Sequence, residues 1–168
     1  MLSFAGQAEL QAVGEVLEER FGLSPQALAD YRLLATSRVI WAVRAHARLE
    51  EALVALSVER TGLPLLRRVA VQWKPTSVAL QAFGEAITRS RVELSAEEVQ
   101  RILTDGSVRM TLEGQEQGYV AMVGPAGVLG CGLYLEPVPD EGKTDGLLRS
   151  QLPKAKWSAL GRHLREES

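Results

Sequence analysis

Apolar residues at the start of the chain recur at helical spacing. Leu10, Val13 and Leu17 fall three or four residues apart, with glutamates elsewhere in the same segment, which predicts an amphipathic helix over residues 7–20. Gly22 follows this pattern and fits a helix end, because glycine adopts the left-handed conformation that closes many helices. The first segment is therefore expected to be one helix with a single apolar side.

The next segment changes from helical to extended patterns. Ser24 followed by Pro25 is typical of a capped helix start and predicts a short helix over 25–30. Apolar, β-branched and aromatic residues then predict strands over 31–36 and 38–44. Both faces of the second strand are apolar, so we expect other elements to cover it on both sides.

Helices and strands continue to alternate through the middle of the chain. Helical spacing predicts a helix over 48–57, and a run of β-branched and aromatic residues predicts one strand over 68–74. Thr76 or Ser77 is a suitable cap for a helix that ends before Gly84. The pattern then predicts a strand over 86–93.

Residues 86–168 contain mostly short strands beside one helix, whereas residues 1–85 mix helices and strands. We therefore predict an α+β chain of two packed domains with these boundaries. Ser95 and Glu98 form a capping box that begins the helix of the second domain. Strands are expected over 108–112, 119–123 and 128–135, with a last helix or strand near 155–165.

Glycines interrupt the last of these predicted strands. The turn Gly124-Pro-Ala-Gly predicts a hairpin, and its second strand contains Gly130 and Gly132. Glycine weakens a strand interior and usually marks a bulge, a barrel corner or a close backbone approach. We expect one of these three at each position.

Composition narrows the class of protein. With 168 residues and 46% apolar content the chain can bury a core, and its net charge of −2 gives no overall attraction to nucleic acid. The single cysteine, Cys131, excludes an internal disulfide and a cysteine zinc site, and we expect it to pack as a small apolar residue. No apolar run approaches the roughly 18 residues of a membrane span, and no signal-peptide pattern is present. These features predict a soluble cytoplasmic protein without membrane partners.

No motif of a known active site is present. The sequence contains no glycine-rich dinucleotide loop, no Walker loop and no Gly-x-Ser-x-Gly elbow. His46 and His163 lie far apart, without carboxylates at metal-ligand spacing. We therefore predict no enzyme activity, no catalytic residue, no metal and no cofactor.

A binding surface must then come from local clusters of cations. Residues 143–165 contain six lysines and arginines against Asp145 alone, a local excess of five positive charges, with Trp157 among them. Cations attract phosphates and an aromatic ring can stack on a base. A solvated basic tail with Trp157 in the core explains the same pattern, and both interpretations stay open here.

Two further groups of cations lie outside this tail. Arg67, Arg68 and Lys74 surround Trp73, which we expect in the core because large aromatic residues dominate core packing. Arg89 and Arg91 share one face of the strand predicted over 86–93. They form either a phosphate clamp or a solvated face.

Several short motifs of the second half occur together in one known family. They are the capped helix from Ser95, the Asp105-Gly106 turn, the strand Gly118–Val123 and the segment Val128–Leu133. With these motifs, residues 86–160 resemble a PUA domain, a small pseudo-barrel found in RNA-modifying proteins. Leu148–Lys154 resembles the end of the C-terminal PUA-like region of Sun-type RNA cytosine methyltransferases.

The first half carries a matching resemblance. Val69–Pro75 and the helix that ends at Phe83-Gly84 resemble the junction in two-domain ribosome-biogenesis factors, which carry a pre-PUA domain before the PUA domain. The resemblance implies an α/β pre-PUA-like domain packed on a PUA pseudo-β-barrel. The cofactor domain and the Pro-Cys motif of the methyltransferases are absent, so it implies RNA binding without methyl transfer.

The resemblance also implies where RNA is bound. In PUA proteins RNA contacts the capped helix, its glycine turn and the final strands, which here gives Arg101, Gly106, Arg109, Arg149, Lys154 and Lys156. The implied function is non-catalytic binding of structured RNA, most simply ribosomal RNA, in ribosome assembly or RNA modification. The alternative is a protein-interaction adaptor that joins ribosome-assembly or RNA-modification proteins without contacting RNA.

Overall fold

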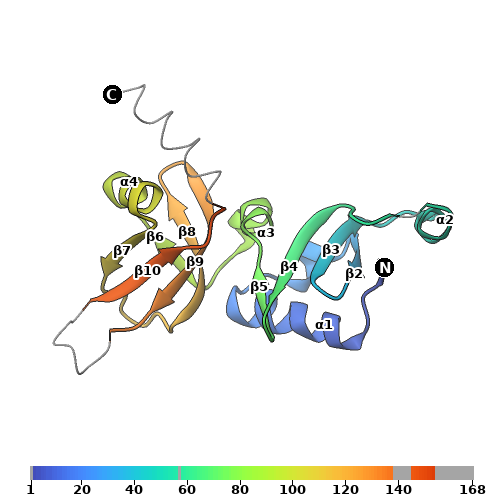
Figure 1. The fold of residues 1–168 in the computed structure, drawn as a ribbon, viewed down its shortest axis with the longest axis horizontal. Helices are drawn as coiled ribbons and strands as arrows, with labels where there is room; N and C mark the ends of the chain where they lie inside the picture. Colours follow the sequence, from blue (N-terminus) through green and yellow to red (C-terminus); the bar gives the residue numbers. More distant parts are fainter. Residues whose placement is uncertain (1, 57, 138–144, 154–168) are drawn as a thin grey trace. The chain divides into compact units, whose positions relative to one another are not determined.

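The computed structural model describes residues 2–56, 58–137 and 145–153. The chain divides into two compact units, Met1–Arg89 and Ser90–Ser168, and the elements of each are labelled in Figure 1. Each unit contains a five-stranded β-sheet, with several helices in the first unit and the helix α4 in the described part of the second, so the coarse prediction of an α+β chain is confirmed. Among the described residues no helix is both long and apolar enough to span a membrane.

The first unit is built around an antiparallel sheet whose strands follow chain order, β1-β2-β3-β4-β5. Its elements are β1 (Ser3–Phe4), α1 (Gln7–Val13), the π-helix η1 (Gly14–Arg20), the 3-10 helix η2 (Pro25–Leu28), β2 (Tyr31–Ala35), β3 (Val39–Arg44), α2 (Leu49–Ala55), β4 (Leu63–Val69), β5 (Gln72–Pro75), α3 (Ser77–Ala82) and the 3-10 helix η3 (Gly84–Ala86).

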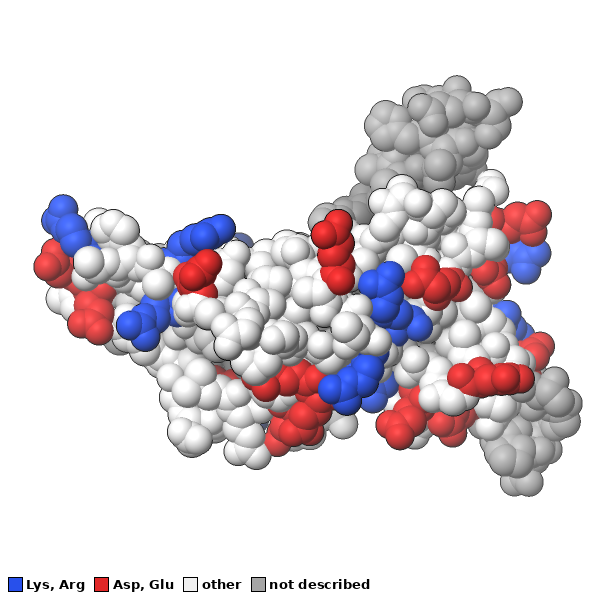
Figure 2. Space-filling view, turned by 180° about the vertical axis from the view of Figure 1, so that it is seen from behind, with Lys and Arg blue, Asp and Glu red and all other residues white. Residues whose placement is uncertain are grey.

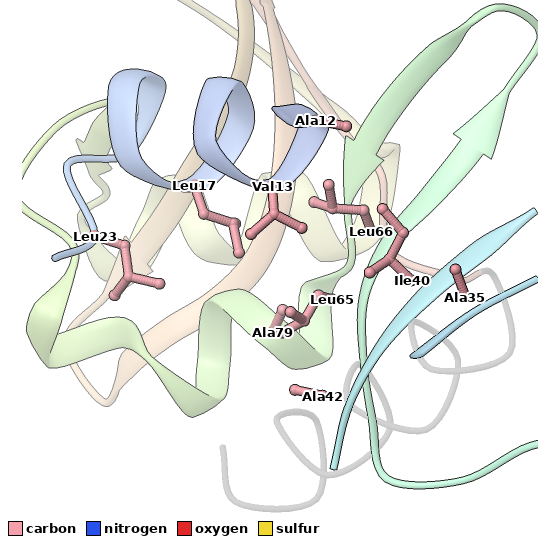
Figure 3. Packing of buried hydrophobic residues seen from close by; sticks show 10 residues of the cluster. All are labelled: Ala12, Val13, Leu17, Leu23, Ala35, Ile40, Ala42, Leu65, Leu66 and Ala79. Carbon is pink, nitrogen blue, oxygen red and sulfur yellow. The ribbon is translucent and has the colours of Figure 1, made fainter. Parts of the chain in front are cut away.

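The core of the first unit lies between this sheet and the helices α1, η1 and α3. Val13 and Leu17 meet Ile40 of β3 and Leu66 of β4, with Ala79 of α3 beside them (Figure 3). The helix predicted over 7–20 is confirmed, although its second half is π-helical. It ends as expected at Gly22, which has a φ of +64° and whose N–H donates to the carbonyl of Glu18 at 2.9 Å.

The single strand predicted over 68–74 is wrong, because the chain reverses within it. β4 ends at Val69 and β5 begins at Gln72, so Ala70 and Val71 form a two-residue turn between antiparallel strands. Valine and alanine continue the extended pattern, and no glycine, asparagine or aspartate marks the turn. Ala70 adopts a φ of +53°. Alanine rarely adopts a positive φ, so the residue type does not predict a turn here.

The second unit contains a mixed sheet of order β6-β8-β9-β10-β7, in which β6 and β8 are parallel and the other pairs antiparallel. Its elements are β6 (Arg91–Glu93), α4 (Ala96–Asp105), β7 (Ser107–Met110), β8 (Gly118–Gly124), β9 (Gly127–Leu135) and β10 (Gly146–Ser150). The helix α4 covers one face of this sheet, where Ile102 packs in a cluster with Met122 and Leu148.

The capped helix and the three predicted strands of this unit are confirmed. The Ser95 hydroxyl accepts from the N–H of Glu98 at 3.2 Å, and the Glu98 carboxylate accepts from the N–H of Ser95 at 2.8 Å. β10 had no predicted strand of its own. The predicted strand over 86–93 is shorter than expected, since only Arg91–Glu93 pairs with the sheet.

Gly130 lies at a bulge, one of the three possibilities predicted for it, whereas the nearest neighbours of Gly132 are side chains and not a backbone. Met122 pairs with Gly130 and Val123 with Val128, so the register skips Leu129 and β9 has a bulge where Gly130 adopts a φ of +144°. A Cβ on Gly132 would lie 2.9 Å from Cγ of Met122. The absence of a side chain at Gly132 therefore makes room for core side chains.

Candidate nucleic-acid interface

The predicted RNA-binding residues of the second unit lie on two different layers. Arg109 of β7 and Arg149 of β10 are exposed, and both alternate with core residues, so they face the side of the sheet away from its core. Arg101 is exposed on α4, which packs against the core side. The structure thus brings Arg109 and Arg149 to one face but leaves Arg101 in another layer. Lys154 and Lys156 lie outside the described residues, together with Trp157 and the element predicted near 155–165.

Gly106 holds the end of α4 in place. It is the C-terminal cap with a φ of +78°, and its N–H donates to the carbonyl of Ile102 at 3.0 Å. Its own carbonyl accepts from the N–H of Ser150 at 2.8 Å. These bonds tie the helix to the end of β10, which gives this glycine a structural role.

Carboxylates outnumber cations in the described part of the second unit. Its sequence contains four arginines against eight aspartates and glutamates over residues 90–137 and 145–153. Arg91 pairs with Glu93 at 3.2 Å, and Arg101 lies one helical turn from both Glu97 and Asp105. The local field over these residues therefore opposes binding of a polyanion.

Arg89 and Arg91, for which the sequence leaves a phosphate clamp and a solvated face both open, do not share the strand face on which both alternatives rest. A guanidinium nitrogen of Arg89 donates to the backbone carbonyl of Glu18 at 3.3 Å, whereas Arg91 lies in β6 and pairs with Glu93. Ser90 between them has a φ of +51°, which breaks the strand alternation on which the prediction rested. The two arginines belong to different units.

The strands of the first unit have the opposite charge pattern. Residues 31–44 and 63–75, which hold β2 to β5 and their two turns, contain six cations and no aspartate or glutamate. The cations are Arg32, Arg38, Arg44, Arg67, Arg68 and Lys74. Four of the eight glutamates of this unit lie instead on α1 and η1, at Glu9, Glu15, Glu18 and Glu19, and two more lie on α2. Arg44 forms an ion pair at 3.9 Å with Asp30, the residue before β2. On the side of the molecule shown in Figure 2, cations and carboxylates alternate in several places, so this segregation belongs to the sheet and not to the whole surface.

Four of the six cations lie on the hairpin of β4 and β5 or on the turn beside it. Arg67 and Lys74 share one face of the hairpin and Arg68 points to the other, because successive strand residues alternate between faces. Arg67 pairs directly with Lys74 across the hairpin. The N–H of Arg68 donates to the carbonyl of Arg38 at 2.8 Å, which places the β2–β3 turn beside it. We call Arg38, Arg67, Arg68 and Lys74 the cationic hairpin; its three arginines are exposed and its lysine is half-buried.

Aromatic rings lie under two of the arginines. The guanidinium carbon of Arg68 is 5.8 Å from the ring centre of Trp73, and that of Arg44 is 5.5 Å from the ring centre of Tyr31. Such contacts stabilise by roughly 0.5–1 kcal/mol when exposed and restrain the guanidinium plane. Trp73 packs against the core as expected but is only half-buried, so its ring also supports Arg68.

An apolar groove lies at the other edge of the same sheet. It has a volume of about 910 Å³ and is lined by β1, α2 and the segment after α2. Val54 and Leu56 contribute to it and are 90% and 60% exposed. Glu50 and Glu59 also line the groove, so its walls combine apolar and acidic groups.

The cysteine and its neighbour Tyr119 show no sign of a reactive pair. Cys131 is fully buried, as predicted, and its thiol lies 3.6 Å from the carbonyl oxygen of Gly132. Burial raises the pKa of Tyr119 above its ordinary value, and negative charge on Cys131 raises it further. A phenol with a raised pKa stays neutral at physiological pH and is not an activated base.

Comparison with known proteins finds no family model and no curated protein that matches this chain. The PUA resemblance therefore remains a hypothesis. The sequence indicates the cationic hairpin only in part, because it shows that residues 31–44 and 63–75 contain no carboxylate. The turn that places Arg67 opposite Lys74 was not signalled.

Proposed function

We propose that this protein binds structured RNA without catalysing a reaction, and that the cationic hairpin is its principal phosphate-binding surface. The observation that carries the proposal is the set of six cations on strands and turns that contain no carboxylate. Lysines and arginines release condensed counterions when they neutralise phosphates, which drives binding even when the protein has a negative net charge.

The proposed ligand is ribosomal RNA, bound during ribosome assembly or RNA modification. This rests on the resemblance to pre-PUA and PUA domains in two-domain ribosome-biogenesis factors. A capped helix beside a glycine-kinked sheet supports it, since both are among the motifs that carry the resemblance. Phosphate contacts would position the RNA, and its shape would select it.

The site is tested by a matched pair of charge reversals in the full chain. Arg38→Glu with Arg67→Glu alters the first unit, and Arg109→Glu with Arg149→Glu alters the second; all four residues are exposed. Filter binding of a ribosomal RNA fragment should show a loss of at least about tenfold for the first double variant, about 1.4 kcal/mol. The salt slope of log affinity should shrink by about two.

The second double variant should stay within about twofold of the unaltered protein, since the described part of the second unit contains eight carboxylates against four arginines. Circular dichroism of both variants controls for folding. Equal losses in the two variants would place the site elsewhere, and affinity without any salt dependence would contradict phosphate binding altogether.

The groove between β1 and α2 favours a second candidate function, that of a protein-interaction adaptor. An adaptor needs an apolar surface that is exposed when no partner is bound, and Val54 and Leu56 provide one. Val54→Glu with Leu56→Glu should then abolish capture of a ribosome-assembly partner while RNA affinity is unchanged. If the same variant loses RNA and keeps its partners, the adaptor function is wrong.

A further inference from the structure

The turn that connects β4 and β5 is apolar and strained. Val69 is 47% exposed and Val71 83% exposed, and between them Ala70 holds a φ of +53°. Residues other than glycine rarely adopt this conformation, and exposed turns usually contain polar residues or glycine. We call Val69–Val71 the hairpin tip.

The hairpin tip extends directly from the cationic hairpin. Arg67 and Lys74 form one cross-strand pair, Arg68 and Trp73 the next, and Val69 with Gln72 closes the strands at the turn. A ligand bound by these cations therefore reaches the exposed side chain of Val71. The stacked Arg68 presents a planar guanidinium close to the same turn.

We propose that the hairpin tip contacts unpaired bases of the RNA whose phosphates the cationic hairpin binds. The inference rests on the proposed function and restricts the ligand to RNA with unstacked bases, in loops, bulges or single strands. Valine gains nothing from a phosphate or a ribose hydroxyl, but it can pack on the face of a base, as apolar wedges do between unstacked base steps. In A-form RNA duplexes the base faces are stacked and the major groove is too narrow for side chains. A duplex therefore has no accessible base face for the hairpin tip to contact.

The decisive variant is Val71→Ser in the full chain. Because this side chain is 83% exposed, its loss leaves the core intact. Affinity for an RNA stem-loop should fall about fivefold, since serine lacks the methyl groups through which Val71 makes its apolar contact with a base. Affinity for a blunt, fully paired RNA of the same length should not change, and the salt slope should be unaltered, since no charge is lost.

Two controls accompany it. Val54→Ser removes an even more exposed valine from α2 and should leave both affinities unchanged. Ala70→Gly keeps the turn without the strained alanine, and should retain stem-loop binding.

The outcomes separate this inference from the proposed function. Equal binding of stem-loop and duplex, unchanged by Val71→Ser, would overturn the inference while the charge-reversal result still stood. If the unaltered protein shows no salt-dependent RNA binding, the proposed function itself is wrong. An apolar tip beside cations also suits an anionic membrane: if Val71→Ser weakens binding to phosphatidylserine vesicles and leaves stem-loop binding unchanged, the tip is a lipid contact and the inference is wrong.

Discussion

The two units have similar sheets and cores but differ in how charged residues are distributed over them. Each has a five-stranded sheet with an apolar core on one face, covered by several helices in the first unit and by α4 in the described part of the second. In the first unit the strands β2 to β5 and their two turns contain cations and no carboxylate, whereas in the described part of the second unit carboxylates outnumber arginines by two to one. A chain with a net charge of −2 can thus still present a cationic surface when one sheet excludes carboxylates.

The sheets also differ in how they accommodate their bulges. In the first, Ile40 pairs with Leu66 and Trp41 with Pro64, so the extra residue Leu65 lies beside a proline. A proline is tolerated at such a bulge, where the ladder is already interrupted. In the second, glycines surround the bulge and leave room for core side chains. Glycine in a strand therefore serves packing here and is not evidence of a ligand.

The largest expected effect comes from core cavities, one in each unit. Leu66→Ala and Leu148→Ala each truncate a fully buried side chain, and each should lower the free energy of unfolding by about 2–5 kcal/mol. Leu66→Ala should also weaken RNA binding, because Leu66 precedes Arg67 on β4. Denaturant unfolding and filter binding measure both effects. If folded Leu148→Ala protein loses RNA affinity as strongly, the contrast between the units fails.

Two glycine substitutions should act in opposite directions. Gly132→Ala places a Cβ 2.9 Å from Cγ of Met122 and 3.0 Å from Cδ1 of Leu148, and should destabilise by about 1–3 kcal/mol. Gly14→Ala in the first unit meets nothing within 4 Å at a helical φ of −58°, and should stabilise by about 0.4–1 kcal/mol. Thermal unfolding compares the two. A neutral Gly132→Ala would show that the core of the second unit is looser than the distances indicate.

The helix caps of the two units should differ by a smaller amount. Ser95→Ala removes the acceptor for the N–H of Glu98 and should cost about 1 kcal/mol. Thr76→Ala should cost more, since the Thr76 hydroxyl accepts from the N–H of Ala79 and also donates to the carbonyl of Pro64. Denaturation midpoints rank the variants, and a larger loss in Ser95→Ala would contradict the second role of Thr76.

The smallest effect is a pH dependence confined to the second unit. Burial first, and then negative charge on Cys131, raises the pKa of Tyr119 above 10.0, so folding favours the neutral phenol. Its contribution to stability is complete below pH 10.0 and is lost as the pH rises through the raised pKa. Tyr119→Phe should flatten this alkaline decline in unfolding experiments. Identical pH profiles for Tyr119→Phe and the unaltered protein would show that other groups cause it.

Local chemistry in the sequence was sufficient for much of the fold. Helical spacing located α1 with η1, and the caps at Thr76 and Ser95 located α3 and α4, because a cap depends on residues only three apart. Gly130 indicated an irregularity in its strand, and only strand pairing shows that this irregularity is a bulge. By contrast, the turn at Ala70 escaped prediction, since its residues favour strands and only pairing with distant strands stabilises its conformation.

What the sequence determined by itself is most of the inventory of helices and strands, though not β10 or the division between β4 and β5, together with the fact that residues 31–44 and 63–75 contain cations without carboxylates. Only the tertiary structure decided which of those cations meet. Strand register places Arg67 opposite Lys74 and brings Arg38 beside Arg68. The packing of α4 on the core side of the second sheet separates Arg101 from Arg109, which faces the other side. Register depends on a turn and on partners far away in the chain, so no local pattern contains it.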